Sequence, residues 1–205
     1  TTRETTILDY HETEYDFENK KYITYYKGTP FSGTIIKKQI YDSDGGEIEF
    51  IKNYKDGKYH GLYERYYDNG KLFEKSTYKD GKWDGLKEVY WSNGQLNTKS
   101  NFKNGKQEGP YEKYYEDGKL EEKSTYKDGK WDGLKEVYWS NGQLNTKSNF
   151  KNGKQEGPYE KYYYSGKLFV KTNYKDGKQE GPYEKYYEDG KLEEKSTYKD
   201  GRIVN

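Results

Sequence analysis

The chain has 205 residues, 36% of them charged, and a net charge of +1. This balance argues against nucleic-acid binding and against a polybasic membrane surface, and the lack of cysteine excludes disulfides, thiolate chemistry and cysteine-ligated zinc. The 27 Tyr and 4 Trp residues argue against disorder, because disordered chains are poor in aromatic residues. No apolar run is long enough to cross a bilayer.

Residues 1–32 differ from the rest of the chain and carry few turn signals. We expect them to form a divergent N-terminal lead-in and cap, with a lead-in strand close to residue 25. Because the chain starts at Thr1 rather than at Met, removal of a signal peptide or lipoprotein leader stays open, and membrane contact is expected only through such an anchor. The compartment, either cytoplasmic or secreted and surface-bound, is also open.

Glycine recurs every 24 residues from Gly61 to Gly181, and a period of this size indicates a stacked repeat protein. We count seven repeats over residues 33–205. Their bounds are 33–60, 61–84, 85–108, 109–132, 133–156, 157–180 and 181–205. The first repeat is longer because of an insertion at residues 41–46.

Each repeat is predicted to be one β-hairpin. In the second repeat, an aromatic strand from Gly61 to Tyr67 precedes Asn69-Gly70, and a return strand follows up to Lys79. Asn-Gly between two such runs favours a two-residue type I′ turn. Asp80-Gly81 then predicts a second turn of the same type, which joins the hairpin to the next one.

Charged residues predict the register of each hairpin. A two-residue turn at Asn69-Gly70 places Glu64 opposite Lys75, whereas a three-residue turn would place it opposite Glu74, which is unfavourable. The same rule brings Glu and Lys together in every regular repeat. The further pairs are Glu88–Lys99, Glu112–Lys123, Glu136–Lys147, Glu160–Lys171 and Glu184–Lys195.

The second turn pairs Tyr78 with Trp83 and Leu72 with Val89, and the two registers together sort the side chains by face. One drier face is expected to collect Tyr63, Tyr67, Leu72, Tyr78, Trp83, Val89, Trp91, Leu96 and Phe102. The other, charged face collects Leu62, Glu64, Tyr66, Phe73, Lys75, Thr77, Leu86, Glu88 and Tyr90. This alternation is typical of an antiparallel sheet with one drier face.

We therefore expect an all-β fold, an elongated repeat array of antiparallel β-hairpins that forms one long twisted sheet. The lead-in is too short to cover an aromatic face of this length. That face must curl on itself, pair with another chain in an oligomer, or stay partly open as a groove.

Long blocks of the chain are exact copies of one another. Residues 76–115 recur without change as residues 124–163. Identity at surface positions indicates recent duplication, so part of the regularity reflects history rather than structural need.

The repeat unit, in which Gly-x-Tyr-Glu-x-Tyr-Tyr precedes Asn/Asp-Gly-Lys-Leu and a later Tyr-Lys-Asp/Asn-Gly-Lys, resembles the bacterial variant of the MORN repeat. Clear copies are residues 109–132 and 181–204, and the lead-in at residues 25–33 is similar to the segment that opens such proteins. The resemblance implies hairpin arrays that serve as protein-binding scaffolds. Some relatives are labelled YwqK-type antitoxins, thought to neutralise a partner toxin, and others are secreted or surface repeat proteins. The resemblance implies no catalytic residues.

Metal and catalytic sites find little support. His11 and His60 are the only histidines, and their spacing gives no zinc motif. The segment with Asp42 and Asp44 is similar to a calcium loop but lacks its full spacing, so a solvated insertion is the better interpretation. Adjacent carboxylates such as Glu121 and Glu122 should point to opposite faces of a strand. We predict no enzyme activity, no cofactor and no metal.

Aromatic residues on the drier face are the candidates for partner binding, because Tyr and Trp on a rigid scaffold are common binding anchors. The alternative is that they form a cross-strand ladder that only stabilises the sheet. The candidates are Trp83, Trp91, Trp131, Trp139, Tyr67, Tyr115, Tyr163 and Tyr187.

The sequence thus favours a non-enzymatic protein-binding repeat scaffold with a protein partner, either a toxin or a host protein. By resemblance, we favour an immunity or antitoxin role. The alternative is a secreted bacterial surface protein that contacts host cells, glycans or lipid.

Overall fold

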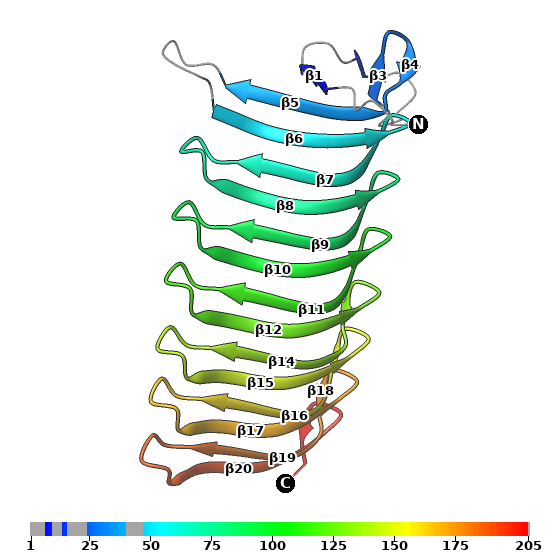
Figure 1. Ribbon diagram of the computed structural model, residues 1–205. Helices are drawn as coiled ribbons and strands as arrows, with labels where there is room; N and C mark the ends of the chain where they lie inside the picture. Colours follow the sequence, from blue (N-terminus) through cyan, green and yellow to red (C-terminus); the bar gives the residue numbers. More distant parts are fainter. Residues whose placement is uncertain (1–6, 10–13, 16–23, 40–46, 205) are drawn as a thin grey trace. The chain divides into compact units, whose positions relative to one another are not determined.

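The chain folds into strands and turns, as the all-β prediction requires (Figure 1). The computed structural model describes residues 7–9, 14–15, 24–39 and 47–204. Among these residues, no helix is long and apolar enough to cross a membrane. Most of the predicted cap and the insertion at 41–46 lie outside the described residues. The same holds for His11, Asp42 and Asp44.

The strands belong to two compact units, residues 1–97 with 101–106, and residues 98–100 with 107–205. The first unit contains β1 (Ile7–Asp9), β5 (Gly33–Gln39), β6 (Glu47–Lys55), β7 (Lys58–Tyr66), β8 (Leu72–Lys79) and β9 (Lys82–Tyr90), and a small sheet of β2 (Glu14–Tyr15), β3 (Thr24–Tyr26) and β4 (Thr29–Pro30). The residues of β10 (Leu96–Lys103) are divided between the units.

The second unit continues the same pattern. Its strands are β11 (Lys106–Tyr114), β12 (Leu120–Lys127), β13 (Lys130–Trp131), β14 (Gly133–Tyr138), β15 (Leu144–Lys151), β16 (Lys154–Tyr162), β17 (Leu168–Lys175), β18 (Lys178–Gln179), β19 (Gly181–Tyr186), β20 (Leu192–Lys199) and β21 (Arg202–Ile203). Within each unit, the repeat strands that pair with each other are antiparallel. Of the described strands, β1 alone pairs in parallel, with β5.

The Asp-Gly turns are two-residue type I′ turns, as predicted. Asp80 and Gly81 both have positive φ, 51° and 82°, which this turn type requires. Tyr78 lies opposite Trp83, and Lys79 lies opposite Lys82. The same geometry recurs at each Asp-Gly or Asn-Gly turn that joins two repeats.

The other turn is not the predicted type I′ turn. Tyr67 N–H donates to the carbonyl of Lys71, and Gly70 N–H donates to that of Tyr67. Gly70 has positive φ, 74°, whereas Asn69 does not. These bonds define a three-residue loop, a type I turn followed by a glycine bulge, rather than a two-residue turn. The Asn69 side chain accepts the Lys71 N–H at 3.0 Å and so stabilises the loop.

A β-bulge restores the predicted pairing of charges. After the longer loop, Tyr66 pairs with Leu72, but the register then shifts so that Arg65 pairs with Glu74 and Glu64 with Lys75. Phe73 is the extra residue on β8. The predicted Glu–Lys pairs are therefore correct although the turn is not. Those described are Glu64–Lys75, Glu112–Lys123, Glu136–Lys147, Glu160–Lys171 and Glu184–Lys195.

This bulge also changes the predicted faces. Leu72 shares the face of Tyr66, because the two are directly opposite. Phe73 instead contacts the ring of Tyr67 at a centroid distance of 5.0 Å. Leu72 and Phe73 thus exchange the faces that the sequence assigned to them.

A second irregularity corrects the predicted pairing of Leu72 with Val89. The register shifts by two residues between Tyr78–Trp83 and Ser76–Lys87, and Val89 pairs with Glu74. The shift falls at Gly85, which has φ of 113°. Corresponding positions interrupt the strand between β13 and β14, and between β18 and β19.

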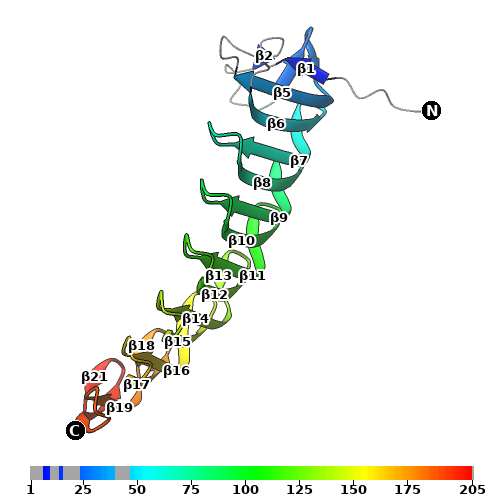
Figure 2. The ribbon, with the colours of Figure 1, turned by 60° about the vertical axis from the view of Figure 1, so that its left-hand side comes forward.

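The ribbons of individual strands are curved rather than flat (Figure 2). The rings of Tyr59 and Tyr63 lie 6.2 Å apart although they are four residues apart on β7, a separation of about 13 Å in a flat strand. The bend closes toward their side of the sheet. We call this side the inner face, defined by Tyr63, Arg65, Glu74, Ser76, Tyr78, Trp83, Lys87, Val89 and their counterparts, and the other side, with Glu64, Tyr66, Lys75 and Glu88, the outer face.

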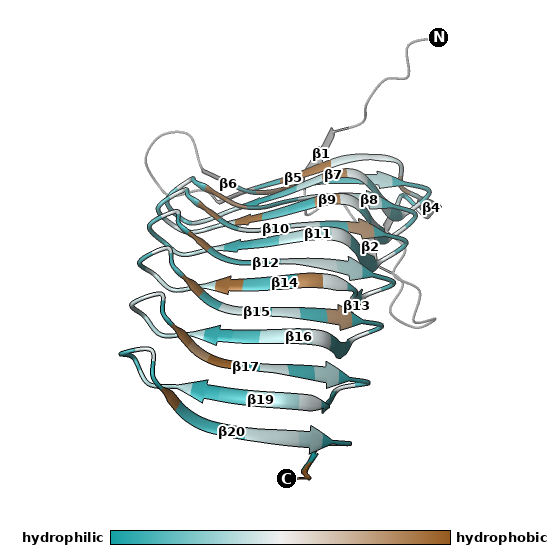
Figure 3. Ribbon diagram, turned by 90° about the horizontal axis from the view of Figure 1, so that it is seen from below, coloured by the Kyte–Doolittle hydropathy of each residue, from teal (hydrophilic) through white to brown (hydrophobic). Residues whose placement is uncertain are grey.

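Buried apolar residues are concentrated at the beginning of the first unit. Phe31, Ile35, Phe50 and Tyr54 form one cluster, and Tyr26 and Tyr59 pack against it. Beyond this cluster the strands carry mostly hydrophilic residues with short hydrophobic stretches (Figure 3). Stability of the repeats therefore depends on cross-strand contacts rather than on a thick core.

Backbone hydrogen bonds join successive Asp-Gly or Asn-Gly turns of neighbouring repeats. At the Asp-Gly turns, Gly81 N–H donates to the carbonyl of Tyr59 at 2.8 Å, and Gly105 N–H donates in the same way to Trp83. This bond recurs through both units up to Gly201 and Gln179. Successive turns are thus held together by backbone bonds that depend little on the side chains.

Candidate functional site

The inner face carries one row of aromatic rings close to the Asp-Gly turns. In the first unit, Tyr59, Tyr78, Trp83 and Phe102 lie in sequence, with neighbouring ring centroids 5.1, 6.0 and 5.2 Å apart. In the second unit, Tyr126, Trp131 and Phe150 repeat the last two of these contacts, and Tyr111 contacts Tyr126 as Tyr63 contacts Tyr78. We call these residues the turn row.

An apolar hollow of about 420 Å³ lies against the turn row. Tyr59, Tyr78 and Trp83 line it, together with Lys82 and the turn glycines Gly81 and Gly105. Aromatic walls beside a lysine suit a ligand that has both apolar and acidic groups.

A second row of aromatic residues lies at the opposite ends of the hairpins. The hydroxyl of Tyr67 donates to the carbonyl of Tyr90 at 2.7 Å, and Tyr115 donates to Tyr138 at the same distance. Trp139 Nε1 donates to the carbonyl of Tyr162 at 3.4 Å. We call these residues the loop row, and most of its described bonds link one repeat to the next. Its members are Tyr67 and Trp91 in the first unit, and Tyr115, Trp139, Tyr163 and Tyr187 in the second.

The predicted candidates therefore fall into two rows rather than one. Trp83 and Trp131 belong to the turn row, and the other six belong to the loop row. Because loop-row polar atoms bind the backbone of the next repeat, their main visible role is structural. The turn row has ring contacts and an adjoining hollow, and it is the better candidate for a partner.

Two lysines on the inner face contact the Trp residues of the turn row. The sequence pointed only to aromatic residues at this face and did not indicate these lysines. Lys87 Nζ lies 4.0 Å from the centroid of the Trp83 ring and 3.0 Å from Glu74 Oε1. In the second unit, Lys135 repeats both contacts, with Trp131 at 4.0 Å and Glu122 at 3.0 Å. The repeated ion pair and cation–π contact fix the position of each Trp. The exact copying of residues 76–115 is the sequence signal that could have revealed this cluster.

A row of small hydroxyl residues lies between these aromatic and charged side chains. Ser76 is fully buried, and its counterparts Ser100, Ser124, Ser148, Thr172 and Ser196 are also buried. Ser76 lies opposite Tyr63 on one side and Lys87 on the other. Small side chains here leave room for the larger neighbours on the inner face.

Acidic residues before the bend have a structural role. Asp84 Oδ2 accepts the backbone N–H of Asn104 at 3.0 Å, and Glu108, Asp132, Glu156 and Glu180 do the same in later repeats. These bonds cap the first residue of the following type I′ turn. His60 stands at the corresponding position, with its Nδ1 3.4 Å from Asp80 Oδ1.

The outer face carries rows of alternating Glu and Lys residues within each unit. Lys75 lies opposite Glu64 and also opposite Glu88. Tyrosine hydroxyls donate to the same carboxylates, for example Tyr66 to Glu64 at 2.9 Å. Burial, and then this hydrogen bond, raise the pKa of Tyr66 to about 12. Hydrogen bonds from Lys171, Tyr186 and Lys195 lower the pKa of Glu184 to about 2.

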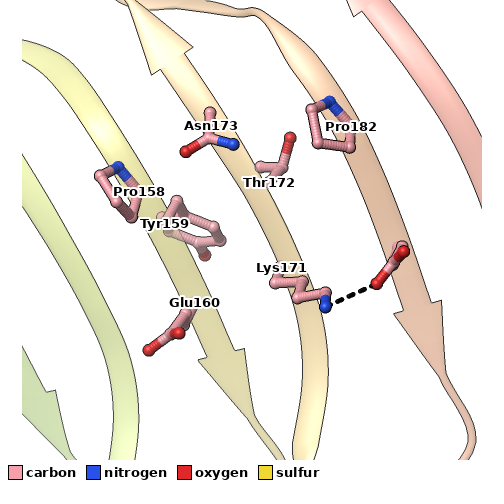
Figure 4. Close-up of a pocket in the computed structure, with 8 residues that line it drawn as sticks. Pro158, Tyr159, Glu160, Lys171, Thr172, Asn173 and Pro182 are labelled. Carbon is pink, nitrogen blue, oxygen red and sulfur yellow. Dashed lines mark ion pairs between the residues drawn. The ribbon is translucent and has the colours of Figure 1, made fainter.

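A smaller hollow of about 270 Å³ lies on β16, β17 and β19 (Figure 4). Pro158, Asn173 and Pro182 line its outer-face part, and Lys171 Nζ pairs with Glu184 at 2.7 Å across it. The proline nitrogens lie next to the bend, where the ladder is already interrupted. Lys171 and Glu184 neutralise each other, and Tyr162 donates to Glu160 at 2.7 Å, which leaves little to attract a ligand.

Catalytic groups are not brought together in the part of the chain that the structure describes, and no group of three potential metal ligands occurs there. One carboxylate prediction needs correction. Glu121 pairs with Lys113 at 2.7 Å and Glu122 with Lys135 at 3.0 Å. Both lysines extend from the inner face, so both carboxylates reach that face instead of pointing to opposite sides. The reason is the bulge at Glu121, which breaks the alternation of side chains along the strand. Each carboxylate nevertheless has its own lysine, which disfavours a role in acid–base chemistry.

The chain matches the model of a family described as the MORN repeat variant. The matched residues are 59–80, 83–104, 107–128, 131–152, 155–176 and 179–200. These segments cover more than half of the sequence. The chain belongs to the MORN repeat variant family. Each matched MORN segment contains one hairpin loop and ends at the first residue of an Asp-Gly or Asn-Gly turn. No curated protein matches the chain.

MORN repeats and an open all-β repeat fold are typical of scaffolds without enzyme activity. The turn row, with Trp83 in the first unit and Trp131 in the second, is therefore the candidate functional site of this MORN repeat protein.

Proposed function

We propose that the protein is a non-enzymatic scaffold that binds another protein through its inner face. The observation that carries this proposal is the turn row beside an apolar hollow of about 420 Å³. Tyr and Trp residues with accessible faces are frequent hot spots of protein interfaces. The backbone bonds between turns hold these rings in place before any partner binds, which lowers the entropic cost of association.

The partner that we favour is a toxin, which the scaffold would neutralise as an immunity or antitoxin protein. The support is the resemblance of the repeat unit and lead-in to bacterial repeat proteins with that label. Co-expression with a toxin encoded beside this gene tests the role. We expect growth to be restored by the wild-type chain, and unchanged growth inhibition would contradict it.

A secreted surface protein is the second candidate. The exact copy of residues 76–115 at 124–163 favours it, because recent duplication suits a protein whose repeat number changes. Antibody labelling of intact cells tests this role. Labelling of unbroken cells would support it, and labelling only after lysis would exclude it.

The chain itself offers variants to test the inner face. At the position of Trp83 and Trp131, other repeats have Gln107, Gln155 and Gln179, and Gln155 and Gln179 take the corresponding place in the ladder. The double substitution Trp83→Gln with Trp131→Gln should therefore preserve the fold and remove the large rings. At the positions of Trp91 and Trp139, other repeats have Tyr, so Trp91→Tyr with Trp139→Tyr is the matched control.

The binding experiment compares these variants on a partner captured from the native organism by the wild-type chain. We expect W83Q/W131Q to weaken binding at least about tenfold, since loss of an aromatic hot spot costs about 2 kcal/mol or more. W91Y/W139Y should bind normally. Equal affinity of all three proteins, with unchanged circular dichroism, would contradict the proposed face.

A further inference from the structure

One repeat before Ser76, a lysine takes the position that the small hydroxyl residues hold in later repeats. Lys52 on β6 lies opposite Tyr63, and Tyr63 in turn lies opposite Ser76. Lys52 therefore occupies the place on β6 that Ser76 occupies on β8. Later return strands have a buried Ser or Thr at this position. Replacement of a small hydroxyl by a long cation on the inner face suggests a local function rather than a general requirement of the repeat.

Two further cations lie on the neighbouring row. Lys37 is opposite Phe50, and Phe50 is opposite Arg65. Lys52 Nζ lies 3.8 Å from the centroid of the Phe50 ring, and Arg65 Cζ lies 4.5 Å from that of Phe73. A hollow of about 620 Å³ opens beside them, lined by Lys37, Glu49, Phe50, Lys52, Tyr63, Arg65, Tyr66 and Asp68.

The positive charges in this hollow are only partly compensated. Lys37 pairs with Glu49 at 2.7 Å, but neither Lys52 nor Arg65 forms an ion pair with any residue that the structure describes. Glu74, directly opposite Arg65, is bound by Lys87 at 3.0 Å. Asp68, at the start of the hairpin loop, is the other carboxylate of the lining.

The surroundings of Lys52 disfavour its own charge. Burial lowers the pKa of Lys52, and the positive charges of Lys37 and Arg65 lower it further, against the opposite effect of Glu49. A half-buried ammonium without a carboxylate partner costs free energy. An incoming anion would recover that cost, so the cluster has the properties of a binding site.

We propose that Lys52 and Arg65 bind a carboxylate of an acidic segment of the partner protein. This assignment rests on the proposed binding function of the inner face. The planar guanidinium of Arg65 can bind a carboxylate through two parallel hydrogen bonds. Phe50 and Tyr63, which line the same hollow, supply apolar contacts for the adjoining peptide. A doubly charged phosphate fits less well, because Glu49 and Asp68 line the same hollow and would repel it.

A peptide titration tests the assignment on the full-length chain. The probe is acetyl-Glu-Tyr-Glu-amide, and its matched control is the Gln-Tyr-Gln peptide, with binding measured from NMR signals of the Lys52 and Arg65 side chains. We expect saturable shifts with the acidic peptide and affinity at least about tenfold weaker for the control, since one charge-assisted hydrogen bond contributes at least that factor.

Variants taken from other repeats make the test specific. Lys52→Ser introduces the residue of Ser76, and Arg65→Val introduces that of Val89. Each should weaken peptide binding about tenfold, whereas Lys79→Ser, which removes an exposed charge at a turn, should leave it unchanged. Equal affinity of wild type, K52S and R65V would overturn the assignment. Tighter binding of inorganic phosphate than of the peptide would overturn the choice of carboxylate.

Failure of this site and failure of the scaffold are distinguishable with the captured partner. If W83Q/W131Q loses that partner while K52S and R65V retain it, the scaffold stands and the carboxylate site is wrong. If all of these variants retain it, both proposals are wrong. Loss in K52S, R65V and W83Q/W131Q supports both.

Discussion

At the scale of single residues, one position of the repeat accepts side chains of very different chemistry. The place of Ser76 is taken by Lys52 on β6, and the place of Trp83 by Gln155 and Gln179 in later repeats. Backbone pairing is the same in each case. The repeat therefore separates a constant frame of turns and bulges from variable positions that are free to carry binding chemistry.

The tyrosines of the outer face predict how stability depends on pH. Burial, and then hydrogen bonds to Glu64, Glu88 and Glu160, raise the pKa of Tyr66, Tyr90 and Tyr162 to about 12, from 10.0 in an unperturbed tyrosine. A raised pKa in the folded state stabilises the fold below pH 10.0, and this stabilisation is lost as the pH rises through about 12.

Tyrosinate absorbance and far-UV circular dichroism, recorded together during an alkaline titration, check this prediction. A group of tyrosines should ionise late, together with unfolding. Ionisation of all tyrosines close to pH 10.0 in a folded chain would contradict the hydrogen-bonded arrangement.

The acidic caps of the turns give a second residue-scale prediction. Glu156 Oε2 accepts the N–H of Asp176 at 2.8 Å, so Glu156→Ala should lower the free energy of unfolding by about 1 kcal/mol. Glu188→Ala, in an exposed loop of the same unit, is the control and should change it by less than about 0.5 kcal/mol. Urea denaturation measures both. Equal effects of the two substitutions would argue against the cap.

At the scale of elements, the sequence predicted the strands and the Asp-Gly turns but not the bulges. If the turn alone set the register, Glu64 opposite Lys75 would require a two-residue turn at Asn69-Gly70. The structure reaches the same pair through a three-residue loop and an extra residue, Phe73. Two compensating irregularities leave no trace in residue spacing. The shift at Gly85 was equally hidden, because the glycine fits either a turn or a bend.

The type I′ turns predict a specific tolerance to substitution. Asp176 has φ of 51°, a conformation in which Asn is well accepted and β-branched residues are strained. Asp176→Asn should change the free energy of unfolding by less than about 0.5 kcal/mol, since Asn104 and Asn152 hold the same position and conformation. Asp176→Val should destabilise by about 1–2 kcal/mol. Thermal or urea denaturation would refute the turn assignment if Val were tolerated as well as Asn.

At the scale of the whole molecule, the sequence predicted an all-β repeat protein, which the structure confirms, and named aromatic candidates for partner binding, which stay a prediction. It could not divide those candidates into a turn row and a loop row, because the division depends on the hydrogen bonds that Tyr67, Tyr115 and Trp139 make to the next repeat. It also did not single out Lys87, which contacts Trp83 and Glu74, or Lys52, which lies opposite Tyr63.

The copied block predicts that two hairpins can be removed without loss of the fold. Deletion of residues 76–123 joins Lys75 to Ser124 and recreates the natural junction of Lys123 with Ser124. Because repeat proteins gain stability from nearest neighbours, the shortened chain should fold, and its urea m-value should fall by about a quarter with the lost surface.

Deletion of residues 76–121 is the matched control for this shortened chain. It removes almost the same length but leaves Glu122 and Lys123 as additional residues after Lys75, so the strand no longer matches the repeat period. The control should unfold at a lower urea concentration than the chain that lacks residues 76–123. Equal midpoints for the two deletions would contradict the requirement for a 24-residue register.

The central claim is that the partner contacts the turn row of the inner face. The four Trp indole N–H signals of the wild-type chain report on it directly in a nitrogen–proton NMR spectrum recorded with and without the captured partner. We predict that the signals of Trp83 and Trp131 shift or broaden on binding, whereas those of Trp91 and Trp139 change little. Changes confined to Trp91 and Trp139, or to none of the four, would contradict the account.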